Sequence, residues 1–236
     1  MRTNTRIAEI NDISTSLKGK MFSLMERYYE NVDYKIFEDD LYSKDKVILL
    51  EQGDTLCGFS TQKYFLHSYA GEQVGVVFSG DTIVDRPYRG GMHLSICWGR
   101  MMLDYLQSNG SKKLYWLLTS KGYKTYRFLS VFFNTYYPGL KGQVTPFEKE
   151  LCQNIALYLF GDRMMQDPGV ISAASNAQCV IEDEGEVTQG RRSDPHVRFF
   201  EERNPRHSQG DELVCLARFE KSNLRPAILR QLEVIS

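Results

Sequence analysis

The chain has 236 residues, of which 42% are hydrophobic and 25% charged, so it can bury a full core without disulfides or metals. Its formal net charge of -1 gives no overall field that would attract nucleic acid or an anionic membrane, and we expect small molecules or proteins as partners. The cysteines and histidines are widely spaced with no ligand spacing among them, which argues against a metal site. No apolar run is long enough to span a bilayer, and we expect a cytoplasmic protein.

The first half of the chain predicts helices followed by a run of strands. Residues 6–10 read as a short strand, and Asp12 is placed to cap a helix that runs toward residue 29. A second short helix is expected near residues 37–42. Four consecutive antiparallel strands then follow, at residues 46–51, 55–62, 63–69 and 74–85.

A buried helix is predicted at residues 92–107, because its polar residues form one narrow stripe and the remaining faces are apolar. The next strand, residues 113–119, should be parallel to the strand before the helix, since a helical crossover returns the chain in that direction. An aromatic helix is expected at residues 123–136.

The C-terminal part, residues 146–236, predicts a helix at 147–160, a long polar insertion at 163–212 that contains a short strand near 178–181, and a firmer strand at 212–219. We therefore expect an α+β fold: a mostly antiparallel sheet with one parallel pair, flanked by helices. One domain is expected over residues 1–236, with its core at about 6–145.

Residues 81–93 are the most informative stretch, because they read as a strand, a basic glycine turn and a helix start. Unpaired N–H groups at a helix N-terminus carry partial positive charge, and Gly90 and Gly91 let a ligand approach the backbone. Arg86 and Arg89 add full charges at the same point. The pattern indicates phosphate binding, while a plain turn before a helix is the structural alternative.

This order of elements resembles the GNAT superfamily of N-acetyltransferases over about residues 6–137. In that family the fourth strand leads into a pyrophosphate loop of the form Q/R-x-x-G-x-G/A, which holds acyl-coenzyme A. The matching residues here are Arg86-Pro87-Tyr88-Arg89-Gly90-Gly91, with an arginine where the first glycine is usual, or Arg89-Gly90-Gly91-Met92 in a shifted frame. The resemblance implies that acetyl-CoA or another acyl-CoA is held by Val84, Arg86, Arg89, Gly90, Gly91, Met92 and His93.

The resemblance also implies a catalytic tyrosine on the aromatic helix. Tyr126 matches that position, with Tyr123 as a second choice, and its phenol would protonate the departing thiolate. The alternative is that both tyrosines fill the core, because the aromatic residues of this helix have helical spacing. Asp81 and Asp85 are the candidate bases for the acceptor amine, or ordinary strand-end and turn carboxylates.

The function implied is an acyl-CoA-dependent N-acyltransferase that transfers its acyl group directly to an amine of a small molecule or protein. Two alternatives stay open. In the first, an acyl carrier protein is the donor and docks on a basic surface formed by Lys112, Lys113, Lys121, Lys124 and Arg127. In the second, the chain is a binding module without catalysis. Residues 198–207, which end at His207, are expected to form an acceptor-binding lid or a solvated loop. The acceptor, the acyl length and the oligomeric state are left open.

Overall fold

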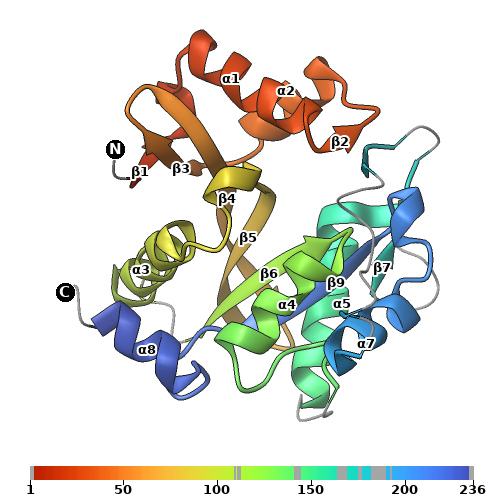
Figure 1. Ribbon diagram of the computed structural model, residues 1–236. Helices are drawn as coiled ribbons and strands as arrows, with labels where there is room; N and C mark the ends of the chain where they lie inside the picture. Colours follow the sequence, from red (N-terminus) through yellow and green to blue (C-terminus); the bar gives the residue numbers. More distant parts are fainter. Residues whose placement is uncertain are drawn as a thin grey trace.

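A computed structural model describes residues 3–108, 110, 113–140, 145–163, 169–174, 177–181, 190–191 and 193–233. Its centre is a seven-stranded sheet in the order β1-β3-β4-β5-β6-β9-β7 (Figure 1). The strands are β1 (Asn4–Glu9), β3 (Lys46–Gln52), β4 (Thr55–Tyr69), β5 (Glu72–Val84), β6 (Leu114–Ser120), β7 (Val170–Ile171) and β9 (Glu212–Arg218). A separate two-stranded sheet pairs β2 (Tyr29–Glu30) with β8 (Cys179–Val180).

Within the large sheet, β5 and β6 are parallel and the other neighbouring strands are antiparallel. The parallel pair arises because α3 (His93–Ser108) connects the two strands as a crossover. The fold class expected from the sequence is therefore confirmed: a mostly antiparallel sheet with one parallel pair, flanked by helices.

Helices cover both faces of this sheet (Figure 1). One face packs against α3, α4 (Tyr123–Phe132), α7 (Pro195–Arg203) and α8 (Pro226–Glu233). The other packs against α1 (Thr15–Glu26), α2 (Tyr34–Tyr42) and α5 (Pro146–Phe160). Strand alternation explains the two layers: in β6, Trp116 joins the first cluster, whereas Tyr115 and Leu117 join the α5 cluster.

Three boundaries differ from the sequence prediction. Residues 55–69 form one continuous strand instead of two, because no turn residue separates Gln62 from Lys63. The cap of α1 is Ser14, whose hydroxyl accepts from the Leu17 amide at 3.2 Å, and Asp12 lies in the preceding 3-10 turn. The helix α4 ends at Phe132 instead of residue 136.

The C-terminal part contains two helices that the sequence analysis did not predict, α7 and α8. Asp194 caps α7 through the His196 amide at 2.9 Å, and a proline occupies its first turn, so the start signals were present in the sequence. The strand expected near residues 178–181 is β8, and the firmer late strand is β9. Parts of the predicted insertion, residues 164–168 and 182–189, lie outside the described residues.

Candidate functional site

The glycine turn expected to bind phosphate directly follows β5. Asp85 caps the 3-10 turn η2 (Arg86–Tyr88) by accepting from the Arg86 amide at 3.0 Å. Gly90 has a φ of +92°, a conformation that favours glycine, and α3 begins at His93. The predicted order of strand, basic glycine turn and helix start is therefore present.

Consecutive amides of this turn are unpaired. Within the part of the chain that the structure describes, the N–H groups of Gly90, Gly91 and Met92 donate to no protein acceptor. They precede the helix N-terminus, where the first amides also lack intrahelical partners. A Cβ at Gly90 would meet no atom within 4 Å, so space is open beside this backbone. The turn thus presents adjacent donors to an anion, and its residues fit a diphosphate group.

Both arginines of the turn, Arg86 and Arg89, are exposed. Arg89 donates from Nε to the Val84 carbonyl at 2.7 Å, and its guanidinium carbon lies 4.6 Å from the centre of the Tyr28 ring. Val84 therefore contributes to the turn by orienting Arg89 through its carbonyl.

Strands β5 and β6 part just before this turn. Their pairing runs from Gly75 and Leu114 to Ser79 and Leu118; beyond that point β5 continues beside β4, and β6 beside β9. A bulge causes the change, because Gly80 and Asp81 together lie opposite one residue of β4. The main-chain groups on the β6 side of β5 lose their strand partner here.

Asp81 lies at this bulge and is half-buried. Burial raises the pKa of its carboxyl to about 6, and the nearby Asp40 carboxylate acts in the same direction. Lys121 and Lys44 oppose that change in pKa, and Glu212 adds to it. Asp40, Lys44 and Glu212 were not predicted as site residues, and Lys121 was named only for the carrier-protein surface. The four residues come from α2, its C-terminal end, the β6–α4 turn and β9, which only the fold brings together.

The predicted acid Tyr126 is fully buried in the core. Its hydroxyl donates to the Pro138 carbonyl at 2.9 Å, and its ring packs against Phe199 and Phe200 of α7 at centroid distances of 6.0 and 5.7 Å. Burial raises the pKa of Tyr126 far above its ordinary value. Tyr123, the second choice, is also buried. This placement favours the alternative of a core role.

The predicted lid residues form α7 and the turn after it. His207 is half-buried, its ring lies 5.3 Å from that of Phe200, and burial lowers its pKa. The main chain of Lys121 opposes that change in pKa, which places His207 near the turn between β6 and α4. The side chain of Asn204 is buried and donates to the Asp211 carbonyl at 2.8 Å, which fixes the turn.

The basic surface expected for a carrier protein is largely paired. Lys113 forms an ion pair with Glu72, Lys121 with Glu212 at 3.6 Å, and Arg127 with Asp194 at 3.0 Å. Lys112 lies outside the described residues. Neighbouring carboxylates therefore neutralise much of the charge that an acidic partner would need.

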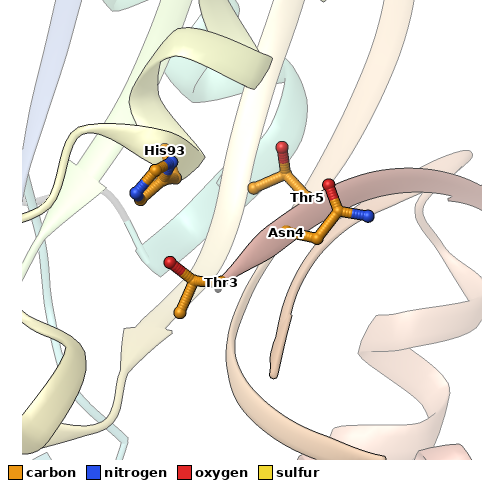
Figure 2. A pocket seen from close by; sticks show the side chains of 4 residues that line it. All are labelled: Thr3, Asn4, Thr5 and His93. Carbon is orange, nitrogen blue, oxygen red and sulfur yellow. The ribbon is translucent and has the colours of Figure 1, made fainter. Parts of the chain in front are cut away.

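A cavity of about 390 Å³ opens near the start of α3, lined by Thr3, Asn4, Thr5 and His93 (Figure 2). His93 belongs to the predicted turn, while the other three residues come from the start of the chain and were not singled out. No sequence signal marked them, since a polar strand end has no special composition. All four side chains are half-buried or exposed.

Within the described residues, no cluster of three or more His, Cys, Asp or Glu side chains could hold a metal ion. The cysteines are free, and burial raises the pKa of Cys97, Cys152 and Cys215, which keeps these thiols protonated. None of the described helices combines the length and the apolar character needed to cross a membrane.

No family model matches the chain, and no curated protein matches its sequence. Solved structures that align with it include a GCN5-related N-acetyltransferase from Kribbella flavida, with 16% identity and a TM-score of 0.41 over 57% of this chain. The chain spans only 34% of the length of that structure. A probable N-acyltransferase from Enterococcus faecalis aligns over 93% of this chain and 67% of its own, with 14% identity and a TM-score of 0.43. Arabidopsis thaliana NAA60 with a bisubstrate analogue aligns over 59% and 92%, with 13% identity and a TM-score of 0.40.

Proposed function

We propose that the chain is a GNAT-like N-acyltransferase that takes an acyl group, acetyl first, from acyl-coenzyme A and transfers it to an amine. One observation carries this proposal. Strand β5 leaves β6 after Ser79 and leads within a few residues into a turn with unpaired amides at the start of α3. The arm of the donor that carries the thioester would lie between the separated strands, and its diphosphate would bind the turn.

The donor's diphosphate would be held by the amides of Gly90, Gly91 and Met92, with Arg86 adding charge. Arg89, oriented by the Val84 carbonyl, and His93 at the helix start complete this set. When bound, the donor supplies an activated acyl group. Main-chain N–H groups on the edge of β5 beyond its pairing with β6 would stabilise negative charge on the carbonyl oxygen.

Asp81 is the proposed base. An amine attacks only in its neutral form, so a proton must leave the acceptor's ammonium group. With a pKa of about 6, the Asp81 carboxyl is ionised at neutral pH and is a stronger base than an ordinary aspartate. It lies where β5 and β6 part, next to the edge at which the acyl group would be presented.

No tyrosine is needed as an acid in this scheme. A thiol has an ordinary pKa of about 8.5, so a thiolate can depart without a strong proton donor. The buried position of Tyr126 supports that view. The paired basic surface weighs against a carrier protein as donor, so coenzyme A is the donor we favour.

The experiment is a thiol-release assay with acetyl-CoA and a panel of primary alkyl amines, aromatic amines and peptide α-amines. We expect amine-dependent thiol release that is lost in Asp81→Asn while acetyl-CoA binding persists. Binding without thiol release for any amine would replace this proposal with the non-catalytic binding module. Absence of binding by any thioester would reject both.

A further inference from the structure

A buried lysine lies beside the proposed base. Lys44 follows α2, and its side chain is only 2% exposed. Its ammonium donates to the Asp40 carboxylate at 2.6 Å, the Asp40 carbonyl at 3.2 Å and the Ser43 hydroxyl at 3.0 Å. Burying an ammonium is costly unless it is paired and hydrogen-bonded, so these acceptors fix its position.

The alkyl stem of Lys44 packs against the bulge of β5. A Cβ at Gly80 would lie 2.7 Å from Lys44 Cε and 2.6 Å from Thr61 Oγ1, closer than real contacts allow. Gly80 and Asp81 are the two residues that the bulge places opposite Thr61. Lys44 therefore fills the space that a side chain at residue 80 would take, at the point where β5 leaves β6.

Two ion pairs flank Asp81 from different elements. Lys44 and Asp40 approach from the α2 side, and Lys121 and Glu212 from the β6–α4 turn and β9. The two pairs differ in burial, because the side chain of Lys44 is 2% exposed and that of Lys121 is 19% exposed. Of the two lysines, Lys44 is the buried one whose stem also contacts the bulge at Gly80, so substitution of Lys44 tests the support of the bulge and the charge together.

We infer that Lys44 is a positioning residue for Asp81: its stem supports the bulge at Gly80, and its ammonium keeps a positive charge beside the Asp81 carboxylate. The inference rests on the proposed function, in which Asp81 accepts the proton of the acceptor amine. A positive charge at this place favours the ionised, basic form of a half-buried carboxyl.

The chain offers a matched control at Lys35, in the first turn of α2. Lys44→Met keeps most of the stem and removes the charge, while Lys35→Met removes the lysine of an exposed pair with Asp39 that has the same four-residue spacing. The Asp81 carboxyl is titrated by carbon NMR in the ligand-free protein, with its signal assigned by its loss in Asp81→Asn. We expect the midpoint to rise by about one pH unit in Lys44→Met and to stay in place in Lys35→Met.

A second pair of variants tests a shift of the Asp81 midpoint in the opposite direction. Asp40→Asn removes a negative charge near Asp81 and should lower the midpoint, whereas Asp39→Asn, at a more exposed residue, should not. Asp40 is 46% exposed, so this substitution is expected to fold even if Lys44→Met does not.

Equal midpoints in each variant and its control would overturn the inference. The titration needs no turnover, so failure of the proposed function, seen as absent thiol release by the wild-type chain, is distinguishable from failure of the Lys44 inference. Where turnover is present, the acid limb of its pH profile should move with the NMR midpoint in Lys44→Met. A limb that stays fixed while the midpoint moves would overturn the positioning role.

Discussion

The Tyr28 hydroxyl donates a hydrogen bond to the Asp85 carboxylate and so ties the segment after α1 to the turn that follows β5. The same hydroxyl accepts from the Arg86 amide at 2.8 Å, and the Tyr28 ring lies beneath the Arg89 guanidinium. Arg27 pairs with Asp85 at 3.1 Å. A carboxylate beside a proposed phosphate site is thus held by a phenol and a cation, and the turn takes its shape from a distant segment.

Removal of this hydroxyl should loosen the turn. In Tyr28→Phe the Asp85 carboxylate and the Arg86 amide lose a partner, and we expect about 1 kcal/mol of lost stability and a several-fold weaker binding of acetyl-CoA. Calorimetric titration and thermal unfolding measure the two effects. Tyr34→Phe, at an exposed position of α2, is the control and should change neither. Unaltered affinity in Tyr28→Phe would show that the turn does not depend on Tyr28.

The ionised Asp81 carboxylate should lower the stability of the folded protein at neutral pH, where it acts as the proposed base. Its pKa is raised from 3.8 to about 6, so the folded state binds its proton more tightly than the unfolded state. The resulting stabilisation is fully present below about pH 4 and is lost as the pH rises through about 6. Asp81→Asn should therefore be more stable than the wild-type chain at neutral pH, by about 1 to 3 kcal/mol, with the difference disappearing in acid.

Thermal unfolding across this pH range, paired with the thiol-release assay, checks that prediction. We expect the variant to gain stability and to lose turnover together. A variant that is less stable than wild type at neutral pH would mean that the charged carboxylate is stabilised by its neighbours.

Substitution of Tyr126 distinguishes a role as general acid from a role as core residue. Tyr126→Phe leaves the Pro138 carbonyl without its donor, and we expect about 1 kcal/mol of destabilisation with turnover changed less than about twofold. Loss of a general acid would instead lower turnover by about 100-fold or more. Tyr158→Phe, at a 70% exposed position, is the control for both readouts. A large loss of turnover in a stable Tyr126→Phe would restore the acid role.

The sequence was sufficient for features whose parts are consecutive in the chain. The strand, the basic turn with Gly90 and Gly91, and the buried helix after it follow one another, and the parallel pairing of β5 and β6 follows from the crossover. Asp81 could be selected as well, because it lies in the strand that leads into this turn.

The surroundings of these residues could not be predicted, because they come from distant parts of the chain. Tyr28 and Lys44 are separated from the turn by other strands, and no local pattern marks their contacts. The environment of Tyr126 depends on Phe199 and Phe200. Since α7 was expected as a polar loop, the core that closes over this tyrosine could not be foreseen.

Substitution of Gly90 tests most directly whether this turn binds the diphosphate. Gly90 and Gly71 both have positive φ, +92° and +79°, and a Cβ at either would meet no atom within 4 Å. Alanine should therefore cost similar stability at both, about 1 kcal/mol, while only Gly90 lies in the proposed diphosphate turn.

The deciding measurement is calorimetric titration of acetyl-CoA into the wild-type chain, Gly90→Ala and Gly71→Ala. We expect binding by the wild type and Gly71→Ala, and an affinity lower by about tenfold in Gly90→Ala. The absence of binding by the wild-type chain, or equal affinity in all three proteins, would contradict diphosphate binding by this turn.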